Sequence, residues 1–419
     1  MTATAGPAKS IAILLVGAGF VFTGNGLFQT LLPLRADLEG FATALVGLMG
    51  TGYFAGFVLG CLIGPALVKA VGHIRAFAGV TAMAAALTLL FPMLLDPYAW
   101  IGLRLLTGIC LATVFMVVES WLNDQASDDR RGRVLSAYII VSNLVTMAGQ
   151  FMVNLAPLGD QNLFTLVAIL VCLSAVAIAL LPQAEPTPIP SARVDLKGLL
   201  AISPSGTVGC LLVGAVEGAF WTLGPVFGQQ RGMEVFEVTL LMAAFVLGGT
   251  ISQWPLGRLS DRMDRRRVIL PTALATVATG LVIALVPLAD LRAVLAMATL
   301  HGALMVPLYA LMLSHANDSV PNERLVQVSS GLLLIYSIGA ALGPVAAAPV
   351  MAVAGAGGLF LFISAALAAL AAFILYRMLF GRRTFERIEV SPFMPVPKTS
   401  QSVYELEVDS DDDDGKGAA

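Results

Sequence analysis

Twelve apolar runs, each long enough for a helix to cross a bilayer, recur along this 419-residue chain. A helix needs roughly 20 residues to cross about 30 Å of hydrocarbon. The runs are continuously apolar, whereas barrel strands are short and alternate in polarity. We therefore expect an all-α membrane protein whose twelve transmembrane helices lie near residues 11–33, 42–69, 74–95, 98–122, 133–157, 162–182, 205–228, 235–256, 267–288, 291–314, 325–352 and 354–379.

Composition argues against a soluble globule. Hydrophobic residues make up 58% of the chain and charged residues 12%, with a mean hydropathy of +0.86, which is too much apolar surface for a water-soluble domain. The four cysteines lie far apart without metal-ligand spacing. The chain also lacks a hydrolase triad, a phosphate-binding glycine loop and a haem motif. We expect no enzyme activity, cofactor, metal or nucleic-acid partner.

The basic residues predict the orientation of the chain. If the N-terminus is cytoplasmic, twenty of the 24 Lys and Arg residues fall in loops and tails on the inside, and Arg35, Arg231 and Arg292 fall outside. Lys and Arg are retained on the cytoplasmic side. The pattern predicts a multi-pass protein of the bacterial inner membrane with both termini in the cytoplasm.

A proline-rich break divides the spans six and six, as a linker between two halves would. The segment 64–75, after the second span, occupies the place that 257–267 occupies after the eighth, which indicates parallel repeats. The predicted organisation begins with a cytoplasmic N-terminus (1–10), a six-helix bundle (11–182) and a cytoplasmic linker (183–204). A second six-helix bundle (205–379) and a disordered acidic cytoplasmic tail (380–419) follow.

Polar residues avoid every third span, so the other spans are expected to line a shared wet cavity. Asn143, Gln150 and Asn154 share one helical face because they are spaced i, i+7 and i+11. Helix-to-helix hydrogen bonding remains an alternative for any single amide of this stripe. The candidate cavity residues are Asn25, Gln29, Asn143, Gln150, Asn154, Trp221, His301 and Tyr336.

Two ionisable residues inside spans are candidates for proton coupling. Glu217 lies midway along 205–228, where a carboxylate needs a partner, water or a proton, and Trp221 follows one turn later on the same face. A neutral acid bonded to a neighbouring helix is the alternative. Arg104 cannot lose its charge, so it must pair with an acid, a backbone carbonyl or an anionic solute. Both proton-relay tuning and substrate anchoring are open for Arg104.

Two motifs resemble those of the major facilitator superfamily, over about residues 11–379. The segment Gly257-Arg258-Leu259-Ser260-Asp261-Arg262-Met263-Asp264-Arg265-Arg266 is similar to the family's G-x-L-a-D-r-x-G-r-r loop, with Asp264 in place of the second glycine. Arg104-Leu105-Leu106-Thr107-Gly108 is similar to R-x-x-q-G. The segments 25–35 and 119–123 further resemble a poorly characterised bacterial subgroup typified by YcaD.

The resemblance implies two six-helix bundles that transport a solute by alternating access. It also implies a gate in which Asp261 clasps the start of the span 133–157 through the positive end of that helix. Glu119 and Asp124 would pair with Arg258 or Arg262, whereas Arg265 to Arg267 would set topology alone. The candidate gating residues are Glu119, Asp124, Arg131, Gly257, Arg258, Asp261 and Arg262.

The sequence thus predicts a monomeric, proton-coupled secondary transporter whose partners are a small organic solute, protons and the lipid bilayer. A proton-driven multidrug or metabolite efflux pump is one alternative, although 133–157 lacks the Gly-Pro pair of the family's drug antiporters, while 339–344 has a similar shape. The first repeat has Val68 in place of the loop acid, so the implied gating roles rest on the second loop. A transport-inactive membrane scaffold or sensor is an alternative of another class.

Overall fold

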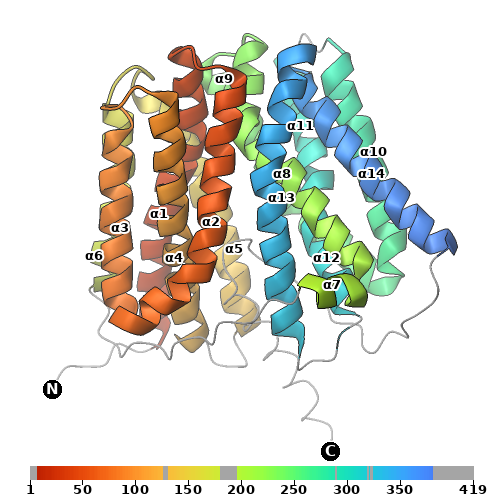
Figure 1. Ribbon diagram of the computed structural model, residues 1–419, viewed down its shortest axis with the longest axis horizontal. Helices are drawn as coiled ribbons and strands as arrows, with labels where there is room; N and C mark the ends of the chain where they lie inside the picture. Colours follow the sequence, from red (N-terminus) through yellow and green to blue (C-terminus); the bar gives the residue numbers. More distant parts are fainter. Residues whose placement is uncertain are drawn as a thin grey trace, which may run out of the picture.

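The structure is a computed structural model that describes residues 7–125, 131–179, 196–287, 290–318, 320 and 324–380. Within these ranges the chain forms helices joined by short turns, arranged as two bundles side by side (Figure 1). In the described part of the chain eleven helical spans are long and apolar enough to cross a membrane, with Leu291–Asn317 counted as one, and Asn162–Ile178 is a shorter apolar helix. The prediction of an all-α membrane protein is confirmed.

The first half contains six helices at the predicted spans. They are α1 (Pro7–Leu38), α2 (Thr43–Val71), α3 (His73–Leu90), α4 (Pro97–Gln125), α5 (Arg131–Phe151) and α6 (Asn162–Ala179). A 3₁₀ turn, η2 (Met152–Leu155), continues α5. The six predicted spans of this half therefore each contain a helix.

The second half repeats the pattern with two differences. Its helices are α7 (Leu196–Ile202), α8 (Pro204–Gln230), α9 (Val235–Arg262), α10 (Arg265–Leu285), α11 (Leu291–Met305), α12 (Leu308–Asn317), α13 (Leu325–Ala354) and α14 (Gly358–Phe380). The short helix α7 lies inside the predicted linker 183–204. The span 291–314 is two helices that meet at Pro307, because proline lacks the N–H that a continuous helix would use.

Helix contacts show that the halves are parallel repeats. In the first half α1 packs on α5, α2 on α4, and α3 on α6. The corresponding pairs of the second half are α8 with α13, α9 with α11, and α10 with α14. The same pairing recurs in the same chain order, which confirms the two six-helix pseudo-repeats.

Glycines allow the central helices to approach closely. A Cβ on Gly108 of α4 would clash with the carbonyl oxygen of Tyr53 on α2 and lie 2.9 Å from the Phe57 nitrogen. In the second half a Cβ on Gly302 of α11 would clash with the Phe245 carbonyl of α9. Small residues at such crossings strengthen van der Waals packing, because lipid tails supply no hydrophobic force between helices.

The bundle has two different ends. At one end α9 finishes and α10 begins, and this end, which holds Arg262 and Arg265, is called the basic face. The other end, where α1 finishes and α2 begins, is called the opposite face. At the opposite face Gln230 Nε2 donates to Thr43 Oγ1 at 3.2 Å and Gln229 Nε2 to the Leu34 carbonyl at 3.5 Å. Further in, Thr51 Oγ1 donates to the Ala341 carbonyl at 2.6 Å. These bonds join the halves at the opposite face, and α2 leans away from α13 towards the basic face (Figure 1).

A matched pair of glycines on α4 tests the packing argument. Gly108→Ala should destabilise the protein by about 1–3 kcal/mol, since overpacking a helix crossing forces the backbones apart. Gly102 has nothing within 4 Å of its ideal Cβ, so Gly102→Ala should leave stability unchanged or raise it slightly. Thermal unfolding in detergent measures both variants. Equal melting temperatures for the two variants would contradict the close crossing of α2 and α4.

Candidate functional site

A cavity of about 250 Å³ lies between the two halves. Its walls come from α1, α2, α4 and α5 on one side and from α8, α9 and α13 on the other, with Val306 from the joint between α11 and α12. Among the described residues none of its lining belongs to α3, α6, α10 or α14, so the prediction that every third span stays away from the cavity is confirmed. The lining includes the predicted residues Asn25, Gln29, Asn143, Glu217, Trp221 and Tyr336.

Glu217 lies on the α8 wall of this cavity. Its side chain is buried, and its Oε2 accepts a hydrogen bond of 2.7 Å from the Tyr336 hydroxyl of α13. Trp221, one turn along α8, lines the same cavity. The carboxylate is therefore held in place by a hydroxyl of a neighbouring helix while it still borders the cavity.

Arg104 lies in the opposite half, next to the cavity wall. Its Nη2 donates to Gln29 Oε1 at 3.1 Å, and its guanidinium lies 4.2 Å from the centre of the Tyr53 ring. Gln29 and Tyr53 line the cavity, whereas Arg104 is 4% exposed and does not. Arg104 thus contacts the cavity through these two side chains.

The predicted polar stripe of α5 meets three different surroundings. Asn143 lines the cavity, and its Nδ2 donates to Thr250 Oγ1 of α9 at 3.1 Å. Gln150 is fully buried outside the cavity lining. Asn154 lies in the 3₁₀ turn, where its Nδ2 is 3.3 Å from Thr239 Oγ1 of α9. The prediction that all three form the cavity wall is therefore wrong for Gln150 and Asn154, because the wall follows only the middle of α5.

His301, also a predicted cavity residue, lies within the second half. It is fully buried, with Nδ1 at 2.9 Å from Thr279 Oγ1 of α10 and its ring 5.3 Å from that of Phe360. It is absent from the cavity lining. Its contacts are those of a packing residue that joins α11 to α10 and α14.

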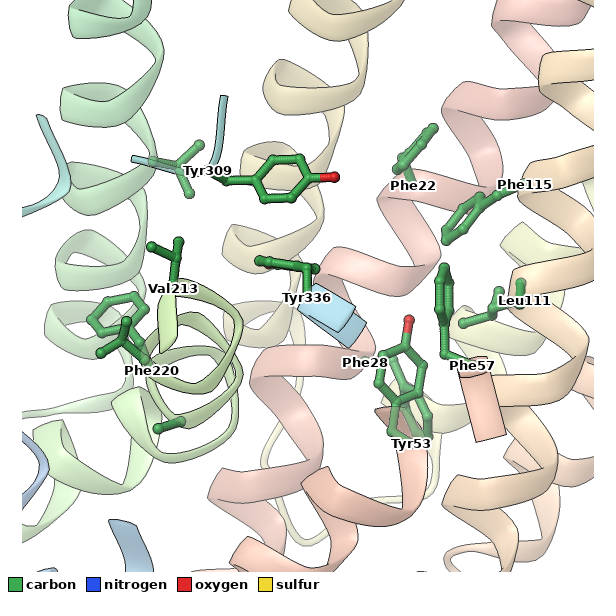
Figure 2. Close-up of a cluster of buried hydrophobic side chains, with 14 of the residues drawn as sticks. Phe22, Phe28, Tyr53, Phe57, Leu111, Phe115, Val213, Phe220, Tyr309 and Tyr336 are labelled. Atoms are coloured by element: carbon green, nitrogen blue, oxygen red, sulfur yellow. The ribbon is translucent and has the colours of Figure 1, made fainter. Parts of the chain in front are cut away.

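Aromatic residues of α1, α2 and α4 form much of the first wall, and sequence reasoning missed them. Phe22 stacks on Phe115 with ring centres 5.0 Å apart, and Phe57 lies 6.4 Å from Phe115. Figure 2 shows these three rings gathered on one side, with Tyr336 on the other. An aromatic residue in an apolar span looks the same in sequence whether it faces a cavity or a packed neighbour, so the sequence carried no signal for these rings.

The motif at the end of α9 forms a buried charge cluster. Arg265 is fully buried, with Nε at 2.8 Å from Asp318 Oδ2 and Nη1 at 3.1 Å from Asp261 Oδ1. Its Nη1 also donates to Ser260 Oγ at 3.0 Å. The interpretation that Arg265 sets topology alone is therefore wrong, since its guanidinium also holds two acids in a buried ion-pair cluster.

The other predicted gating residues are placed as follows. Glu119 is buried and accepts a 2.9 Å bond from the Tyr138 hydroxyl, while Arg258 lies 3.7 Å above the centre of the Trp254 ring. Pairing of Glu119 or Asp124 with Arg258 or Arg262 stays a prediction. Gly257 is buried, and Asp124 and Arg262 are exposed. The side chains of Arg131 and its neighbours at the start of α5 lie outside the described residues, so the clasp with Asp261 stays a prediction.

Comparison with known proteins agrees with this architecture. The family model described as Major Facilitator Superfamily matches residues 14–236 and 206–404, and the chain belongs to that family. It is 28% identical over 340 residues to an uncharacterized MFS-type transporter, YcaD, of Escherichia fergusonii, covering 80% of this chain and 87% of the relative. The Salmonella newport YcaD is 29% identical over 349 residues, with 82% and 89% covered.

Solved structures show the same fold at low sequence identity. The nucleoside transporter NupG superposes with a TM-score of 0.73 at 12% identity, covering 88% of this chain and 99% of that one. The transporter FucP in its outward conformation gives a TM-score of 0.57 at 16% identity, with 88% and 98% covered. These structures share the fold, and membership of the major facilitator superfamily makes the chain a multi-pass membrane transporter, which is a class of protein without enzyme activity.

Thiol labelling tests the extent of the cavity. In a background without the four native cysteines, Asn143→Cys should react with a water-soluble maleimide because Asn143 lines the cavity. Gln150→Cys, seven residues along the same helix, should stay unreactive because that position is fully buried. Ala369→Cys on the lipid-facing side of α14 serves as a second control. Reaction of all three positions would contradict the assignment of the cavity wall.

Proposed function

We propose that the chain is a proton-coupled secondary transporter that moves a small organic solute across the bacterial inner membrane by alternating access. The observation that carries this proposal is the cavity between the halves, which is bordered by the buried carboxylate of Glu217. Secondary transporters of this build bind their solute near the midplane, at the interface of their repeats. The chain is proposed to act as a monomer, because each copy holds a complete cavity.

The basic face is proposed to be cytoplasmic. Lys69, Arg262 and Arg324 are among the basic residues at this face, whereas Arg35, Arg231 and Arg292 lie towards the opposite face, and Lys and Arg are retained in the cytoplasm. The hydrogen bonds between Gln230 and Thr43 and between Gln229 and Leu34 then close the periplasmic side. The cavity is proposed to open towards the cytoplasm in this state.

Coupling is proposed to occur at Glu217. An ionised carboxylate is expensive inside a membrane, by roughly 2.5–3.5 kcal/mol on insertion scales and more in a fully apolar setting. Protonation removes that cost and allows the halves to rock past each other. The Tyr336 hydroxyl donates a hydrogen bond of 2.7 Å to the carboxylate. This hydrogen bond is proposed to weaken or break when a proton or a solute binds Glu217.

Gating is proposed to involve the charge cluster at the basic face. Arg265 fixes the end of α9 to the start of α10 and, through Asp318, to the end of α12. Asp261 is 30% exposed while it pairs with Arg265, and it is proposed to clasp the positive end of α5 when the halves close on this side. The cluster would therefore move as one rigid body with the second half.

Replacing Glu217 tests the coupling. Glu217→Gln imitates the protonated side chain, so the variant should bind solute and exchange it between equal concentrations but lose accumulation driven by a pH gradient. The solute is first found by thermal-shift screening of metabolites, since bound solute stabilises the folded state. Uptake is then measured in proteoliposomes with an imposed pH gradient.

Tyr336→Phe is the matched control for this experiment. It removes the hydrogen bond but keeps the carboxylate and the ring, so accumulation should persist with a shifted pH optimum. Wild-type accumulation by Glu217→Gln under the pH gradient would remove Glu217 from the mechanism.

A further inference from the structure

Arg104 is a buried cation whose charge no acid balances within the described part of the chain. Its Nε and Nη1 atoms are buried and have no hydrogen-bond partner there. Its described contacts are one hydrogen bond to Gln29 and the faces of two rings, at 4.2 Å from the centre of Tyr53 and 5.4 Å from that of Phe28.

The other two buried arginines that the structure describes are each paired with acids. Arg35 lies 2.6 Å from Glu39, and Arg265 lies 2.8 Å from Asp318. A buried charge without a partner costs several kcal/mol, and an arginine cannot escape this cost by losing its proton. Arg104 therefore stands apart from the other buried arginines and calls for an anion that is not part of the described chain.

The cavity offers the route by which such an anion would reach Arg104. Gln29 and Tyr53 both line the cavity and both contact Arg104. Rotation of the unbranched Gln29 side chain would present the guanidinium to a bound solute, and its amide would then donate to the same anion. Arginine is well suited to carboxylates because charge-assisted hydrogen bonds to them are short and strong.

The remaining walls indicate what the anion is attached to. Eight of the cavity residues are aromatic, namely Phe22, Tyr53, Phe54, Phe57, Phe115, Trp221, Phe245 and Tyr336. These ring faces offer dispersion and stacking to a flat apolar body, and polar neighbours such as Asn143 and Gln253 can hydrogen-bond its substituents.

We propose that the solute is a small organic monoanion, a carboxylate on an aromatic body, whose carboxylate pairs with Arg104. This inference rests on the proposed function and names its substrate class. It also sets the charge balance of transport. The anion neutralises Arg104 and one proton neutralises Glu217, so the loaded cavity carries the same net charge as the empty cavity with Glu217 ionised. Symport of one proton with one monoanion would then be electroneutral.

Binding to the purified, detergent-solubilised protein tests the proposal without a membrane gradient. Benzoate and 3-phenylpropanoate are the probes, benzamide is the neutral counterpart of benzoate, and sodium chloride at equal concentration is the inorganic control. The melting temperature should rise with the concentration of at least one of the two carboxylates and level off as the site fills. Benzamide and chloride should leave the melting temperature unchanged. Arg104→Gln should raise the half-saturating concentration about tenfold or more, as expected for the loss of a charge-assisted bond.

A second variant separates loss of the site from loss of the fold. Gln29→Glu places an acid next to Arg104, so it should raise the melting temperature of the unliganded protein and abolish the response to the carboxylates. Gly102→Ala, on the helix that carries Arg104 but with open space around its Cβ, should keep that response. No response to either carboxylate, an equal response to benzamide or chloride, or a wild-type response in Arg104→Gln would each overturn the proposal.

The two proposals fail in different ways. Carboxylate binding through Arg104 without uptake driven by a pH gradient would overturn the proton coupling and keep the anion site. Uptake of another solute driven by a pH gradient, with no carboxylate binding, would overturn the anion site and keep the coupling.

Discussion

Hydrocarbon offers no water to a polar group, and this constraint organises the whole molecule. Backbone groups satisfy it by forming helices, and side chains satisfy it by meeting other polar groups between helices. Glu217 meets Tyr336 at 2.7 Å, and Arg104 meets Gln29 at 3.1 Å. Both pairs lie beside the cavity between the halves, so polar groups that lipid excludes border the space where a solute is proposed to bind.

Close helix packing makes each half a rigid unit around the boundary between the halves. Gly108 brings α4 against α2, and Gly302 brings α11 against α9. The halves also approach closely, since Gly47 of α2 lies against Pro344 and Ala348 of α13, and single hydrogen bonds such as those of Thr51 and Gln230 cross the same boundary. Such bonds can be exchanged for others at modest cost, since the net contribution of one hydrogen bond is about 1 kcal/mol. The proposed rocking about the central cavity would therefore have to separate the α2–α13 packing as well as these hydrogen bonds.

The helices and their places in the two repeats could be predicted from the sequence, because a membrane span is recognised from the summed hydropathy of about 20 residues and not from any single one. The position of single side chains could be read only where they sit in the middle of a helix, as Glu217 and Asn143 do. Asn154 was wrongly predicted to line the cavity, because α5 ends before it and the 3₁₀ turn that follows does not keep the residue on the helical face of Asn143. Arg265 was misassigned because its partner Asp318 lies 53 residues away, and no local pattern reveals a pair at that distance.

The two halves are proposed to separate and rejoin at the opposite face when Glu217 gains or loses a proton and when the cavity binds or releases solute. Spin labels at Thr43 and Gln230, which are hydrogen-bonded to each other at this face, would report this movement most directly through their distance distribution in lipid nanodiscs. The account predicts two distances whose populations shift with pH in the wild type and no longer shift in Glu217→Gln. A single distance that is independent of pH and of bound solute would contradict it.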